Sequence, residues 1–410
     1  MIKSTFLTTA AIFAALAGTA AAVAQPRAAG SGGPATYWMS AETTSGLAAM
    51  SQSAQSGGRP SMIGAMTGRG SMSGRGPGYV RNLTLQLGSP RRAAGAPSAE
   101  HLPPAGLGAG PSLPLVSPER VPPAPTPTYD PRQMGNPQGR ILIYWGCGER
   151  VRPGQPFEID LARLRPGQLP PAMAQLAVQA MNPPSAATAA TYGEWPNQRS
   201  ISAVPADGSL VGAHMVRGNY SPEINFSLAA ANDFLAPVRV TANGPAASRA
   251  VPVAWQSVAN ARAWFMMTTG AAEDGTIVIW TSSEVEFSQL GAFDYLSDAE
   301  TDRLLRQRVL MPATTTQCTV PSEVAGRVQA ATLMLNAFGG EANFSAPRPA
   351  GAARGWRPDW TVKLRTRSAY MGMLGQDIEA MMRGDDRAGE SRREERPRRR
   401  RGLLERVIGQ

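Results

Sequence analysis

An unbroken apolar run at residues 141–145, Ile-Leu-Ile-Tyr-Trp, places the tightest constraint on how this chain folds. Its length and its β-branched and aromatic side chains are typical of a strand that is buried on both faces. Gly146 ends the run, Pro153-Gly154 predicts a turn, and residues 157–161 then form a second predicted strand. We therefore expect the dense β core to begin near Arg140.

Short segments of the same kind recur along the chain. Each combines β-branched or aromatic residues with alternating polar positions, and Gly, Pro, Asn or Asp residues separate it from the next. The predicted strands are residues 79–87, 210–216, 223–228, 238–242, 251–255, 263–268, 276–281 and 360–367. Strands of this length and spacing favour a mainly β (α+β) fold with an antiparallel β-sandwich core.

Two helices are predicted near the C-terminal side of this core. Residues 296–310 begin with Ser297 and have Glu300 three positions later, which is the pattern of a capping box. Residues 322–338 follow a proline and carry apolar residues at helical spacing, and Gly339-Gly340 would end that helix.

The N-terminus predicts export. Lys3 supplies a positive end, residues 6–17 form a short apolar stretch, and Ala22 and Ala24 occupy the small-residue positions before a cleavage site. We expect a signal peptide at residues 1–24, which makes the protein periplasmic or secreted, in the cell envelope of a Gram-negative bacterium.

Composition divides the rest of the chain. Residues 25–78 are a Gly/Ser/Met-rich low-complexity segment in which we expect a disordered region, interrupted by a short edge strand at 36–39. Residues 79–204 form a first β region with a Pro-rich insertion at 89–139, predicted to be a polyproline-like linker or a surface loop. Residues 205–383 form the β-sandwich with its two helices.

The chain has two cysteines, Cys147 and Cys318. An oxidising compartment favours a disulfide between them. The spacing alone fits two buried free thiols equally well.

Groups for catalysis or metal binding are scarce. The two histidines are His101, in the Pro-rich insertion, and His214, in a predicted strand where a hydrogen-bonded structural role is expected. A zinc site needs three or four converging ligands, and no Walker, Rossmann or nucleophile-elbow pattern is present. We expect no metal and no other cofactor, and we name no catalytic residue. Carboxylates near strand ends keep a glycosidase-like pair open; they are Glu149, Asp160, Asp233, Glu284 and Asp294.

The formal net charge is +10, almost all from arginine, and the basic residues cluster in a tail at residues 384–410. In an exported protein the expected partner of such a tail is anionic envelope lipid or lipopolysaccharide, and nucleic acid is not expected. A solvated tail without a specific partner fits the composition equally well. The residues expected to bind an anionic surface are Arg392, Arg393, Arg396, Arg398, Arg399, Arg400 and Arg401.

Two resemblances add to this picture. Residues 251–280 resemble the B and C strands of fibronectin type III-like sandwiches, which implies a β-sandwich here; the matching residues are Val253, Trp255, Val258, Ala261 and Trp264. The segments 145–149 (WGCGE) and 318–324 (CTVPSEV) are similar to uncharacterised exported proteins of Gram-negative bacteria.

Together these patterns predict an exported, envelope-associated, non-catalytic binding or structural module. The alternative is a carboxylate-dependent hydrolase that acts on an envelope polymer.

Overall fold

The computed structural model describes residues 33–55, 78–118, 139–160, 178–200, 203–287 and 294–376. The predicted signal peptide at 1–24 and the arginine-rich tail at 384–410 lie outside these residues. Within them the protein is mainly β, as the sequence predicts, and its strands form three sheets.

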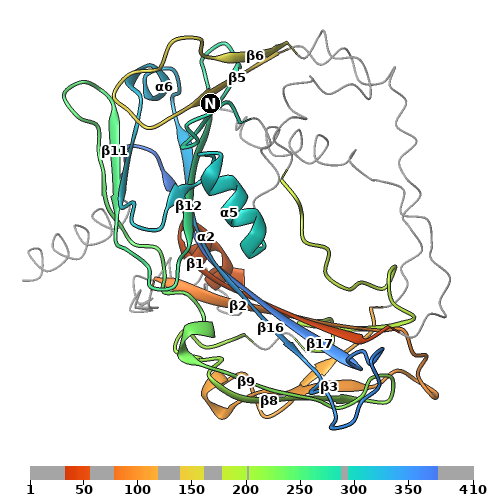
Figure 1. Cartoon of the computed structure of the whole chain (residues 1–410). Coiled ribbons are helices and arrows are strands. Elements are labelled where there is room, and N and C mark those ends of the chain that lie inside the picture. The colour runs from red at the N-terminus through yellow and green to blue at the C-terminus, as the bar shows by residue number, and fades with distance from the viewer. Residues whose placement is uncertain are drawn as a thin grey trace, which may run out of the picture.

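The largest sheet has ten strands and runs through the whole molecule (Figure 1). Two of its pairings are parallel, β1 with β17 and β13 with β5, and the remaining ones are antiparallel. Strands from both β regions of the sequence lie in it. Its order is β6 (Phe157–Asp160), β5 (Arg140–Trp145), β13 (Ile277–Thr281), β12 (Ala263–Ala271), β16 (Ala331–Ser345), β17 (Trp360–Met373), β1 (Ala35–Gly46), β2 (Tyr79–Ser89) and β7 (Thr191–Trp195), and β14 (Met311–Pro312) pairs with β12.

Two smaller sheets complete the sandwich. In Figure 1 a four-stranded sheet lies below β1, β2, β16 and β17, and β11 (Val251–Trp255), from a three-stranded sheet, lies beside β12. The four-stranded sheet contains β4 (Leu113–Leu115), β3 (Ala99–Leu102), β8 (Gly212–Gly218) and β9 (Ile224–Leu228). The three-stranded sheet contains β10 (Val240–Asn243), β11 (Val251–Trp255) and β15 (Gln317–Val320).

Both smaller sheets pack on the same face of the large sheet. Val362 and Leu364 of β17 belong to the core formed with the four-stranded sheet, and Tyr370 belongs to the core formed with the three-stranded sheet. All three occupy even positions of one strand, and side chains alternate between the faces of a sheet. We call this apolar face the inner face and the opposite one the outer face.

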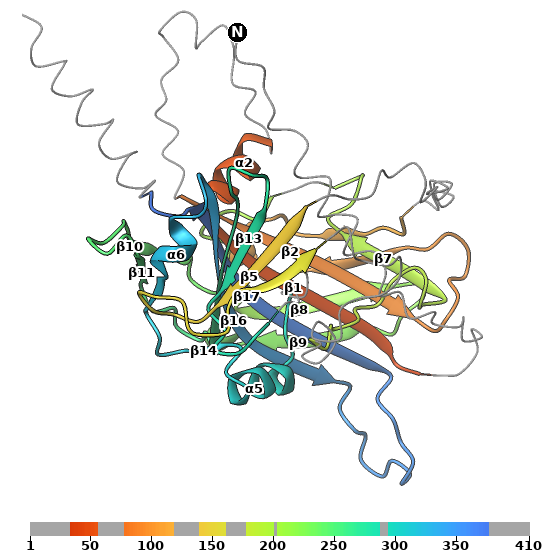
Figure 2. The same cartoon turned by 90° about the horizontal axis from the view of Figure 1, so that it is seen from above.

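A helix covers one end of the outer face. Leu304 of α5 (Asp298–Arg306) packs into a core with Ile143 of β5 and Phe265 of β12. Ser297 accepts a hydrogen bond from the Glu300 N–H at 3.2 Å, so the predicted start of this helix is confirmed, although it ends before residue 310. In Figure 2, α5 and α6 lie beside the same half of the large sheet. The other helices within the described residues are α2 (Leu47–Gln55) and α6 (Ser322–Ala325), together with two 3-10 turns, η1 (Ala105–Leu107) and η3 (Ala230–Asn232).

The predicted helix at 322–338 is wrong. Only α6 is helical there, and residues from Ala331 onward form β16 between β12 and β17. The apolar positions fit both the 3.6-residue period of a helix and the two-residue period of a strand. The strand forms because β12 and β17 on either side supply partners for its backbone hydrogen bonds. The glycines expected to end the helix form a bulge instead, where a side chain at Gly339 would collide with Thr366.

Strand content was also underestimated near the N-terminus. The expected edge strand at 36–39 is part of a 12-residue strand, β1, which lies inside the large sheet between β2 and β17. Small polar residues dilute its apolar alternation and hide it in the sequence. The Pro-rich insertion at 89–139 likewise contains β3 and β4 in its described part, where a linker or loop was expected.

The disulfide between Cys147 and Cys318 is confirmed, with 5.2 Å between the two Cα atoms. It joins the turn after β5 to β15, and so it ties the large sheet to the three-stranded sheet. A link across such a long loop restricts the unfolded chain and can stabilise the fold by up to about 5 kcal/mol.

Substitution of Trp255 tests whether apolar packing holds the three-stranded sheet against the large sheet. Its ring is buried, lies 5.4 Å from the ring of Trp264, and its Nε1 has no hydrogen-bond partner within the described residues. We expect Trp255→Ala to reduce the free energy of unfolding by about 3 to 5 kcal/mol. Trp255→Phe keeps an aromatic ring and loses no hydrogen bond, so it should cost much less. Urea unfolding of the two variants measures the difference; equal losses would contradict the packing role.

Candidate functional site

Polar side chains gather on the outer face where β1 and β17 run side by side. Lys363, Arg365 and Arg367 occupy alternate positions of β17 and point away from the apolar core. The parallel register places them next to Trp38, Ser40 and Glu42 of β1, respectively. Tyr295, just before α5, lies against the same group. We call these residues, with Asp294 and Glu341, the Arg365 cluster.

Cations and aromatic rings alternate through this cluster. The Lys363 Nζ lies 5.5 Å from the centre of the Trp38 ring. The Arg365 Cζ lies 5.2 Å from the same ring and 4.3 Å from the Tyr295 ring. The Arg367 Cζ lies 4.9 Å from Tyr295. Rings at these distances attract the positive charges and hold the long side chains in place.

The carboxylates of the cluster are unevenly shared. Lys363 pairs with Glu341. Arg367 lies 3.1 Å from Glu42 and 3.3 Å from Asp294. Within the described part of the chain, no carboxylate lies at ion-pair distance from Arg365, whose Nε donates a hydrogen bond to Ser40 Oγ at 2.7 Å.

This difference shows in the two arginines. Arg365 is only 6% exposed, and its burial lowers its pKa because the charged form loses hydration. Burial acts on Arg367 in the same direction, but the charge of Glu42, the hydrogen bond that Arg367 donates to Glu42 and the charge of Asp294 outweigh it and raise that pKa. The charge of Asp294 also acts on Arg365 but does not outweigh burial, so Arg365 is a buried cation without an ion-pair partner among the described residues.

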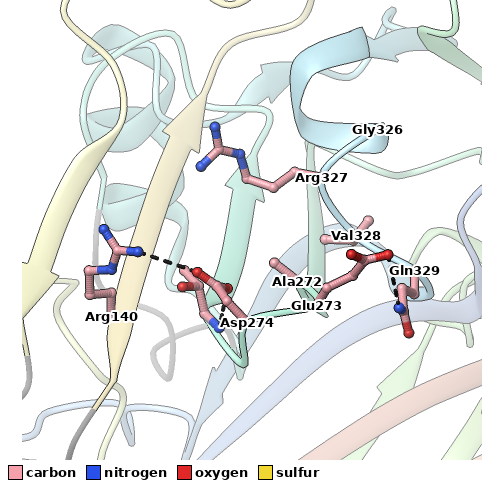
Figure 3. Close-up of a pocket in the computed structure, with 9 residues that line it drawn as sticks. Arg140, Ala272, Glu273, Asp274, Gly326, Arg327, Val328 and Gln329 are labelled. Carbon is pink, nitrogen blue, oxygen red and sulfur yellow. Dashed lines mark hydrogen bonds and ion pairs between the residues drawn. The ribbon is translucent and has the colours of Figure 1, made fainter.

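A second candidate is a hollow of about 580 Å³ at the opposite end of the large sheet (Figure 3). It lies between the β12–β13 turn, the start of β5 and the loop after α6. Arg140 lies 3.3 Å from Asp274 and 3.7 Å from Glu158, and the Arg327 side chain extends over the hollow. The Thr276 backbone N–H lowers the pKa of Asp274. Cations and carboxylates are balanced here and exposed, so this is the weaker candidate.

The five carboxylates singled out in the sequence do not converge. Glu149 is exposed, Asp233 accepts hydrogen bonds from Ser209 and the Leu210 N–H, and Glu284 pairs with Arg308. Asp160 lies in β6, and Asp294 belongs to the Arg365 cluster. The second carboxylate beside Asp294 is Glu42, which the sequence analysis missed because nothing local marks β1 as a neighbour of β17.

The two histidines, by contrast, meet in the core between β1 and the four-stranded sheet. His214 Nε2 lies 2.7 Å from the Leu210 carbonyl oxygen, which can only accept, so this nitrogen carries the proton. His214 Nδ1 then accepts from His101 Nε2 at 3.1 Å, and His101 Nδ1 accepts from the Tyr37 hydroxyl at 2.7 Å. All three side chains are buried, so the structural role expected for His214 fits this geometry, and His101 shares it.

Within the described ranges, no group of three His, Cys, Asp or Glu residues is placed to hold a metal ion, and no helix has the length and apolarity to cross a membrane. No family model matches the chain, and no curated protein or solved structure matches it either. The seven arginines expected to bind an anionic surface lie outside the described residues.

The histidine chain predicts a pH dependence. Burial lowers the pKa of His101 well below its ordinary value, helped by His214, and burial also lowers the pKa of His214. In the unfolded chain both histidines therefore bind a proton near pH 6.5, whereas in the folded protein they stay neutral to a lower pH. The free energy of unfolding should be highest above this pH and should decrease below it, by up to about 1.4 kcal/mol per pH unit for each histidine.

Thermal unfolding at pH 7.5 and 5.5 measures this effect. The wild type should melt at a clearly lower temperature at pH 5.5, and the double variant His101→Gln with His214→Gln should lose most of this difference. A wild-type melting temperature that does not change between the two pH values would contradict the neutral hydrogen-bonded chain.

Proposed function

We propose that this chain is an exported, envelope-associated, non-catalytic binding or structural module. The observation that carries the proposal is the disulfide, because disulfides persist in oxidising compartments such as the periplasm. The segments 145–149 and 318–324, which resemble exported proteins, are the two that this disulfide joins. The predicted signal peptide supports the same compartment.

The tail provides the proposed attachment to the envelope. Residues 392–401 of the tail contain seven arginines and two glutamates, which give this segment a net charge of +5. Near an anionic membrane each basic residue contributes about 1 kcal/mol, so this segment contributes about 5 kcal/mol. That free energy corresponds to a dissociation constant of roughly 0.2 mM, which recruits the protein to lipid or lipopolysaccharide without anchoring it.

The hydrolase alternative has one observation in its favour. Glu42 and Asp294 approach the same guanidinium, that of Arg367, and so bring two carboxylates to one place. A glycosidase uses one carboxylic acid as a proton donor. Both carboxylates here balance the charge of an arginine, which is the arrangement of a structural ion network, so the binding module is the better proposal.

Vesicle co-sedimentation tests the role of the tail. The full chain should sediment with anionic vesicles and a chain ending at Gly384 should not, while neither should bind neutral vesicles. Because the attraction is electrostatic, about 0.5 M salt should release the full chain. Equal binding by both chains would contradict the proposal.

A further inference from the structure

We propose that the Arg365 cluster is a binding site for a carboxylate-bearing sugar, with Arg365 as its anchor. The site lies on the outer face of β1 and β17, and it is independent of the arginine-rich tail and goes beyond the function proposed above.

The first argument is the unpaired buried charge. A guanidinium removed from water is costly unless an anion and hydrogen bonds compensate it. Arg365 makes one hydrogen bond to Ser40, and its terminal nitrogens have no partner among the described residues. The residue keeps 6% of its surface exposed. The two rings hold the planar guanidinium in place, so its N–H groups are oriented to donate hydrogen bonds to an oxyanion.

The second argument selects a carboxylate. The three cations of the cluster are balanced by Glu42, Asp294 and Glu341, so the cluster as a whole is neutral. A phosphate dianion would meet repulsion from these three carboxylates at short range. A singly charged carboxylate matches Arg365, the one guanidinium of the cluster that has no ion-pair partner among the described residues.

The third argument concerns the rest of the ligand. β1 and β17 are both paired on their two edges, so an extended peptide has no free strand edge to join here. The surface next to Arg365 instead offers the partly exposed ring of Trp38 and, across the register, the amide of Gln86 and the carboxylate of Glu194, which are both already hydrogen-bonded to the Tyr192 hydroxyl. An aromatic face with a few polar groups around it suits a ring that carries hydroxyl groups.

Binding of a galacturonic acid trimer to the full chain tests the site, with the methyl ester of the same trimer as the uncharged control. Calorimetry at about 0.5 M salt suppresses binding by the tail. We expect the wild type to bind the acid, and the ester to bind roughly tenfold to a hundredfold more weakly, the range lost with a hydrogen bond to a charged group.

Variants locate the site. Arg365→Lys keeps the buried charge but loses the fork, and it should weaken binding roughly tenfold. Trp38→Leu should weaken it too. Arg239→Gln removes an exposed arginine just before β10 of the three-stranded sheet and should leave binding unchanged. If the thermal melt shows that Arg365→Lys does not fold, the proposal is tested by two other measurements. These are the binding of the acid by Trp38→Leu and the comparison of the acid with the ester on the wild type.

Several results would overturn the proposal. They are absence of binding by the wild type, equal binding of acid and ester, and unchanged binding by folded Arg365→Lys. Equal competition by inorganic phosphate would exclude the carboxylate preference, and tighter binding of a peptide through its terminal carboxylate would exclude the sugar. If the full chain binds the trimer but does not bind anionic vesicles, only the proposed role of the tail is contradicted.

Discussion

The parallel pairing of β1 with β17 is the interaction on which the rest of the structure depends. It joins the first and the last strands that the structure describes, and it brings Ser40 and Arg365, 325 positions apart in sequence, into contact. β2 and β7 continue the sheet from β1, and β16 and β12 continue it from β17. Without this pairing the large sheet would divide into two separate halves, and the inner face over which the four-stranded sheet packs would not form.

Alternation along these long strands then assigns the two faces their roles. Even positions of β17 build the core that both smaller sheets cover, while odd positions carry Lys363, Arg365 and Arg367 outward. The Arg365 cluster is thus a consequence of strand register, because the pairing places the Trp38 ring of β1 beside Lys363 and the Glu42 carboxylate of β1 beside Arg367. The disulfide acts elsewhere, where it fixes the three-stranded sheet against the end of β5.

Sequence patterns predicted the parts of this structure that are local. Apolar alternation located strands such as 251–255 and the outward-facing side of 360–367, and the Ser297 cap located the start of α5. Residues 322–338 were misassigned because their apolar spacing fits a helix and a strand alike, and only neighbouring strands decide between them. β1 was underestimated for a similar reason, and the Arg365 cluster lay out of reach because its partners come from distant strands that no local pattern connects.

Amide hydrogen exchange followed by mass spectrometry tests the central pairing most directly. Amides in a strand that is paired on both edges exchange only when the sheet opens. Peptides from β1 should therefore be protected as strongly as peptides from β17, and more strongly than those from the edge strand β6. Exchange of the β1 amides within seconds, while β17 stays protected, would show that β1 is not an interior strand and would remove the basis of the Arg365 cluster.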